Sequence, residues 1–178
     1  ILLYPTARAK MMLTSRACAT VAPRVRNLSA YSAEIATASF YVEGGTEIRL
    51  KYPQDIAAAS GDVLVSSANI FLVGSTNTEY WLHRGRKNVE TSITAAAGQG
   101  LLRELSSFPT VNPDSNIRAE YGRVYRTEPH DLRSCRFILH AVTPKYSPGV
   151  SEEQGLTLHN QLKACYSESM RITQMELG

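Results

Sequence analysis

Three polar side chains lie where predicted elements begin or end. Asp55 precedes a short connection, Asn69 follows a predicted strand over residues 62–67, and Glu90 lies next to Val89, where a helix is predicted to begin. Carboxylates accept charge-assisted hydrogen bonds, asparagine both donates and accepts, and a helix start offers free N–H groups to anions. Together these residue types could hold a polar, anionic ligand. Taken singly, Asp55 is more simply interpreted as a turn or capping residue, and Asn69 as an ordinary strand-end asparagine.

Other chemistries have weaker support in the sequence. The chain has no Gly-x-Ser-x-Gly elbow and no Walker phosphate loop. The three cysteines form no Cys-x-x-Cys pair, which argues against a zinc site or a disulfide framework. The histidines show no metal-ligand spacing, so no metal is expected; they are His83, His130, His140 and His159. His140 lies in a predicted strand, where we expect a core histidine with a hydrogen-bond partner.

The predicted elements alternate between strands and helices. Strands are predicted over residues 38–42, 47–51, 62–67, 122–126 and 136–141. The first two are separated by the turn signal Gly44–Gly45. The third has an apolar run without alternation, which predicts burial on both faces. This order predicts an α/β sandwich with a partly parallel sheet.

Two helices are predicted from capping and apolar spacing. Asn88 is a suitable N-cap for a helix from Val89, which Gly98 and Gly100 interrupt before it resumes over residues 101–105. A final helix is capped by residues 151–153. Its expected apolar stripe consists of Leu158, Leu162, Cys165 and Met170.

Composition and charge differ between the N-terminal segment and the rest of the chain. Its 178 residues, 43% hydrophobic and 20% charged, suit one globular domain with an extension, and no apolar run approaches the ~18 residues that cross a bilayer. Five of the 19 basic side chains lie within residues 1–33, which hold none of the 16 acidic ones. We therefore expect a basic leader over residues 1–36 and a folded domain over residues 37–178. The near-neutral charge of the folded domain argues against a nucleic-acid-binding protein whose basic residues are spread over its whole surface.

The leader is rich in Ser, Ala and Arg. This profile is typical of a transit peptide and predicts location in the matrix of a mitochondrion or another organelle. A disordered basic tail is the alternative. An ordered leader would need a partner surface, either protein or RNA.

Five segments, in order, resemble the macro domain, the ADP-ribose-binding module. The residues from Asp55 to Asn69 resemble the family's opening, an Asp-Ile pair before a strand that ends in Val-Asn-Ala-Ala-Asn. The residues 89–98 resemble its helix start and Ala-Ala-Gly motif. The last three matches are to its Gly-x-Ala-x-x-Thr strand, its Val-Ile-His-x-Val-x-Pro strand and the helix that follows; they cover residues 122–127, 137–144 and 162–172.

The resemblance implies a macro-domain-like three-layer sandwich with a mixed sheet and a site for ADP-ribose or a related nucleotide. Asp55 would contact the adenine amino group, and the N–H of Ile56 would contact the ring. Asn69 would contact ribose hydroxyls, and the helix start at Val89 would face the diphosphate.

The sequence departs from the family at the phosphate loop and at the C-terminus. Gly85 is the single glycine of the equivalent loop, residues 83–88, where Arg86 could hold phosphate through charge. An insertion over residues 75–84 precedes it, and Ser66 replaces the first Asn of the strand motif. The family continues with further strands beyond the position of Gly178. We therefore expect a divergent fold that lacks the last strands, with an open sheet edge that a protein partner completes.

Three functions remain open. The first is a nucleotide-binding macro module with an impaired phosphate loop and no catalysis. The second is a structural subunit of a mitochondrial or other organellar protein or ribonucleoprotein complex. The third is an ADP-ribosyl hydrolase, which would use Glu90 at the position of the family's catalytic Asp. We expect hydrolysis to be weak, since the longer Glu side chain misplaces the carboxylate, and such a fold would be a pseudoenzyme.

Overall fold

The structure is a computed structural model that describes residues 2–4, 36–42, 46–52, 55–73, 89–111 and 114–178. The chain divides into two compact units, Ile1–Gln54 and Asp55–Gly178. The predicted division after residue 36 stays a prediction. Gly44–Gly45, Asn88 and most of the leader lie outside the described residues.

The first unit contains a three-stranded antiparallel sheet. Its strands are β1 (Leu2–Tyr4), β2 (Ala36–Val42) and β3 (Thr46–Tyr52), in the order β1-β3-β2. Pairing of β2 with β3 runs from Ala36 opposite Tyr52 to Val42 opposite Thr46. Both strands were predicted, slightly shorter, whereas β1 was not.

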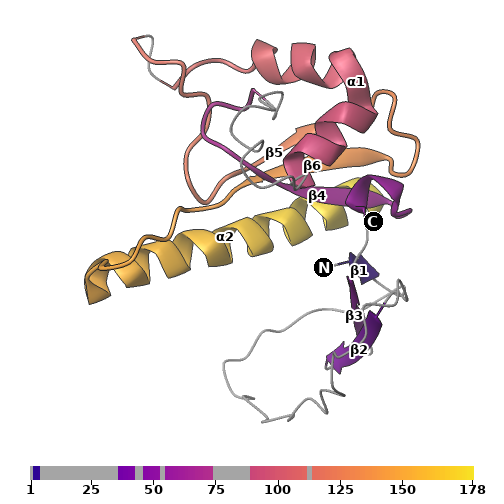
Figure 1. Cartoon of the computed structure of the whole chain (residues 1–178), viewed down its shortest axis with the longest axis horizontal. Helices are drawn as coiled ribbons and strands as arrows, with labels where there is room; N and C mark the ends of the chain where they lie inside the picture. Colours follow the sequence, from indigo (N-terminus) through magenta and orange to yellow (C-terminus); the bar gives the residue numbers. More distant parts are fainter. Residues whose placement is uncertain (1, 5–35, 43–45, 53–54, 74–88, 112–113) are drawn as a thin grey trace. The chain divides into compact units, whose positions relative to one another are not determined.

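The second unit has a mixed sheet between two helices. Its strands are β4 (Val63–Ala68), β5 (Val124–Thr127) and β6 (Phe137–Val142). In the order β4-β6-β5, β4 pairs with β6 in parallel and β5 pairs with β6 antiparallel. Helix α1 (Val89–Ser107) lies on one side of this sheet and α2 (Glu152–Leu177) on the other (Figure 1). This is the predicted α/β sandwich.

The core lies between α1 and the sheet. Buried side chains of α1 pack with β4 and β6 in one apolar cluster, which includes Leu64, Ile93, Leu101, Ile138 and Val142. All six residues of β6 are buried, as expected for the central strand. These contacts fix the start of α1 relative to the end of β4.

A sharp bend divides α1 at Gly98. This glycine has φ 72° and ψ −162°, a conformation that is essentially restricted to glycine. A Cβ at this position would lie 2.5 Å from the Asp131 carboxylate, and the N–H of Asp131 donates to the carbonyl of Ala97 at 3.3 Å. The predicted interruption of the helix is therefore confirmed.

The predicted burial of β4 on both faces is wrong for the described part of the chain. Leu64 and Ser66 face α1 and are buried, whereas Val65 and Ser67 face the other way and are exposed. On that face, the main contacts of helix α2 are with β6 and β5. An apolar run indicates a strand, but burial of its second face depends on where the covering helix lies.

Helix α2 begins at the predicted position, but fewer of its side chains are buried than predicted. Ser151 is its N-cap in a reciprocal capping box with Gln154. Cys165 is buried and its Sγ donates to the carbonyl of Val142 at 3.5 Å. Leu162, expected in the buried stripe, is 38% exposed. No helix in the described ranges combines the length and hydropathy of a membrane span.

Candidate functional site

The site is built where β4 ends and α1 begins. Asn69 follows β4 directly, and Glu90 is the second residue of α1. The Nδ2 of Asn69 donates a hydrogen bond to Oε1 of Glu90 at 3.1 Å. The fold therefore joins two predicted site residues that are 21 positions apart in sequence.

Asn69 is held in place from two directions. Its Oδ1 accepts a hydrogen bond from the N–H of Phe71 at 2.9 Å, and its Nδ2 reaches Glu90. These bonds fix the orientation of the amide. One N–H of the side chain and further acceptor capacity remain for a ligand.

Glu90 is an acid in a poorly solvated position. Burial raises the pKa of its carboxyl group above the ordinary value, and the hydrogen bond from Asn69 opposes this shift only in part. Val89, the first residue of α1, is exposed beside it. The dipole of α1 favours an anion at this end of the sheet.

Asp55 has the local role of a cap. It is the N-cap of the short 3₁₀ helix η1 (Ile56–Ala58), and its Oδ1 accepts from the N–H of Ala57 at 3.0 Å. Ile56 packs against the core cluster. Ser134, just before β6, donates to the carbonyl of Ala57 at 3.3 Å. The described contacts thus join Asn69 to Glu90 and leave Asp55 and Ile56 on a separate element.

Two predicted site residues, Gly85 and Arg86, lie outside the described residues. The side chains that the structure describes include no group of three or more His, Cys, Asp or Glu residues able to hold a metal ion. His140 is a core residue, as predicted. It is 3% exposed, and its Nε2 lies 2.9 Å from Oγ1 of Thr127.

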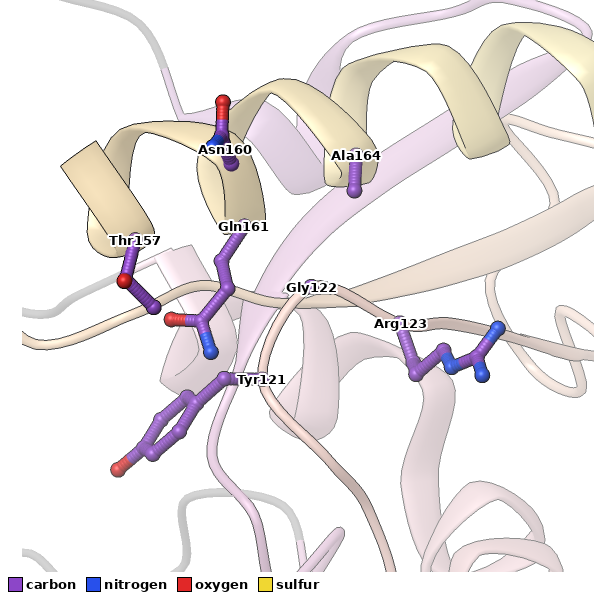
Figure 2. A pocket seen from close by; sticks show the side chains of 7 residues that line it. All are labelled: Tyr121, Gly122, Arg123, Thr157, Asn160, Gln161 and Ala164. Carbon is purple, nitrogen blue, oxygen red and sulfur yellow. The ribbon is translucent and has the colours of Figure 1, made fainter.

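A shallow groove lies elsewhere, between α2 and the turn before β5. It measures about 370 Å³, and its lining consists of Tyr121, Gly122, Arg123, Thr157, Asn160, Gln161 and Ala164. Gln161 extends from α2 toward Tyr121, whereas Arg123 points away along the turn (Figure 2). Gly122 has φ 87°, and a Cβ there would lie 3.3 Å from the backbone of Gln161. The groove was not predicted, and its lining combines no nucleophile with a base.

Comparison with solved structures finds macrodomains. An Oceanobacillus iheyensis macrodomain with MES bound is 23% identical, with a TM-score of 0.59; the match covers 80% of this chain and 65% of that one. A glycine-to-valine variant of the Oceanobacillus iheyensis macrodomain, with ADPR, is 22% identical, with a TM-score of 0.57 and coverages of 79% and 65%. The macro domain of ganglioside induced differentiation associated protein 2 is 21% identical, with a TM-score of 0.50 and coverages of 69% and 49%.

These likenesses show the fold. The chain spans just under two thirds of the Oceanobacillus macrodomain. No curated protein is significantly similar to it in sequence. The family model described as Macro domain matches residues 65–176, more than half of the chain. This chain, with its mixed sheet and the Asn69–Glu90 junction, therefore belongs to the macro-domain family.

Proposed function

We propose that the protein binds ADP-ribose or a related nucleotide at the Asn69–Glu90 junction, without efficient hydrolysis. The observation that carries this proposal is the 3.1 Å hydrogen bond between these side chains at the carboxyl end of β4. Ligands of open α/β sheets bind outside the carboxyl ends of strands, where a helix start also offers N–H groups. The ADPR-bound macrodomain of the same fold supports the choice of ligand.

Weak hydrolysis follows from the type and position of Glu90. Its carboxylate already accepts a hydrogen bond from Asn69, which fixes its position. Compared with aspartate, glutamate carries one more methylene, and a misplacement of about 1 Å costs roughly 100-fold in rate. The single glycine of residues 83–88 supports an impaired phosphate loop.

Calorimetric titration of the full chain with ADP-ribose tests the proposal. We expect saturable binding that Asn69→Ala weakens at least tenfold. Asn160→Ala is the matched control, since it removes the same side chain from an exposed position on α2. The variant Asp55→Ala shows whether η1 takes part in ADP-ribose binding. Absence of binding by the folded chain would rule the proposal out, and rapid turnover of an ADP-ribosylated substrate would favour the hydrolase.

The second candidate is a structural subunit of an organellar complex. The exposed outer face of β4 favours it, because a partner could cover that face. The basic leader supports a mitochondrial location and contact with protein or RNA. Expression of the full chain with a C-terminal fluorescent tag tests the location; diffuse signal outside organelles would contradict it.

A further inference from the structure

We propose that Leu72 is a positioning residue, which holds the side-chain amide of Asn69 in one orientation before any ligand binds. This inference deepens the proposed function and rests on it, because Asn69 is the residue through which we expect the nucleotide to bind. It is argued from the geometry of residues 69–72, which follow β4 directly. We call these four residues the Asn69 turn.

Position 72 has a backbone conformation that leucine rarely adopts. Leu72 has φ 48°, in the left-handed region, where glycine and asparagine are the usual residues. In a bulky residue this conformation costs free energy, and it persists only where the surrounding structure determines it. Such outliers cluster at binding sites, where the strain is part of how the site is pre-organised. The contacts of Leu72 should therefore show what the strain maintains.

The side chain of Leu72 is anchored in the core. It is 1% exposed and belongs to the same apolar cluster as Leu64 of β4 and Ile93 of α1. Strand β4 ends just before Asn69, and α1 carries Glu90. The side chain of Leu72 therefore joins the Asn69 turn to both elements that build the site.

A second anchor holds the middle of the turn. The carbonyl of Ile70 accepts hydrogen bonds from the N–H groups of Arg118 and Ala119, each at 2.9 Å. Ala119 is 1% exposed and lies in the same core cluster as Leu72. The turn is thus fixed to the core at positions 70 and 72, on either side of Phe71.

Hydrogen bonds inside the turn connect these anchors to the amide. The N–H of Leu72 donates to the carbonyl of Asn69 at 3.2 Å, and the N–H of Phe71 donates to Oδ1 of Asn69 at 2.9 Å. Because the Leu72 side chain is fixed in the core, a different φ at this residue would swing the peptide that precedes it. Both N–H groups would then move away from Asn69. The left-handed conformation of Leu72 therefore keeps the amide oriented toward Glu90.

A fixed amide makes ligand binding more favourable. With Oδ1 bonded to Phe71 and one N–H bonded to Glu90, the other N–H of Asn69 is presented to an acceptor oxygen. An amide that is already ordered loses little further rotational freedom when the ligand arrives. Freeing it should weaken ADP-ribose binding about fivefold, the effect of one additional side chain that must be immobilised.

Two substitutions at position 72 separate backbone conformation from core packing. Leu72→Ile keeps the number of side-chain atoms but branches at Cβ, which disfavours the left-handed conformation. Leu72→Met has no branch at Cβ, fills a similar volume and should behave like the native chain. Leu105→Ile is the matched control, because Leu105 is also 1% exposed in the same cluster but lies within helix α1, away from its bend.

Nuclear magnetic resonance of the ligand-free full chain detects the orientation of the amide. The side-chain NH₂ signals of Asn69, assigned by their loss in Asn69→Ala, should move toward the positions of a freely rotating amide in Leu72→Ile. They should stay in place in Leu72→Met and Leu105→Ile. Calorimetry should show ADP-ribose binding about fivefold weaker in Leu72→Ile and changed less than about twofold in the other two variants.

Hydrogen exchange of the native chain tests the turn without any substitution, which keeps the proposal testable if Leu72→Ile does not fold. The N–H groups of Phe71 and Leu72 should exchange at least roughly a hundredfold more slowly than unprotected amides. Exchange of both at the unprotected rate would overturn the proposal, because the turn would then open freely.

Two further results would overturn the positioning role of Leu72. One is that Leu72→Ile leaves the NH₂ signals of Asn69 unchanged, and the other is that Leu105→Ile weakens binding equally. A third result separates this role from the proposed function. If the native chain binds no ADP-ribose but Leu72→Ile still moves the Asn69 signals, the proposed ligand is wrong and the positioning role is supported.

Discussion

Thr127 and His140 meet inside the protein, on neighbouring strands, with 2.9 Å between Oγ1 and Nε2. Both side chains are buried, and each supplies the other with a hydrogen-bond partner. Burial lowers the pKa of His140 from 6.5 to about 4, so the imidazole is neutral in the folded protein at neutral pH.

The first prediction is a loss of stability in mild acid. The unfolded chain protonates His140 below about pH 6.5, whereas the folded protein does so only near pH 4, so the unfolded state gains protons in this window. The free energy of unfolding should fall by about 3 kcal/mol as the pH drops through it. Urea denaturation at several pH values measures this change. In His140→Gln the decrease between pH 6.5 and 4 should be smaller; an unchanged decrease would assign it to other groups.

The second prediction concerns Glu90 and has the opposite pH dependence. Burial raises the pKa of its carboxyl group, so the folded protein binds a proton more tightly than the unfolded chain, and stability falls as pH rises above 4.5. Glu90→Gln should therefore raise the melting temperature at pH 7 and have little effect near pH 4. The same variant should weaken ADP-ribose binding if Glu90 is retained for function. A lower melting temperature at pH 7 would show that its ionised form stabilises the fold.

The third prediction compares two glycines in helices. Gly98→Ala should destabilise the protein by about 1–3 kcal/mol from backbone strain alone, with more from the contact with Asp131. Gly155→Ala is the matched substitution in α2, where the nearest atom to the added Cβ, the Tyr146 hydroxyl oxygen, is 3.6 Å away. It should stabilise by about 0.5–1 kcal/mol. Thermal denaturation measures both, and equal effects would contradict the bend at Gly98.

The fourth prediction tests the start of α2. Ser151 Oγ accepts from the N–H of Gln154 at 3.3 Å, and Gln154 Oε1 accepts from the N–H of Ser151 at 3.0 Å. Ser151→Ala should cost about 0.5–2 kcal/mol, whereas Ser151→Asp should retain most of the stability. Chemical denaturation distinguishes the two variants. Equal losses in both would mean that the cap contributes little.

Local signals in the sequence predicted much of the second unit. The apolar run from Phe137 to Leu139 identified β6, and glycine inside an amphipathic segment identified the bend at Gly98. Capping chemistry identified the start of α2 at Ser151. Each signal acts within a few residues, where backbone preference and side-chain type determine the outcome.

Features that depend on distant residues were not predicted. Pairing of β1 with β3 joins Leu2 to Arg49, far apart in the chain. The exposure of Val65 depends on which strands α2 covers. The Asn69–Glu90 hydrogen bond depends on the position of α1 relative to β4. The family resemblance predicted both residues, but not their contact.

The charged groups along β5 also bear on aggregation. Among the described strands β5 pairs with β6 alone, and its Arg126 forms ion pairs with Glu128 and Glu176. Charged side chains on an edge strand oppose pairing with a further strand. Growth of filaments by strand addition at β5 should therefore be unfavourable.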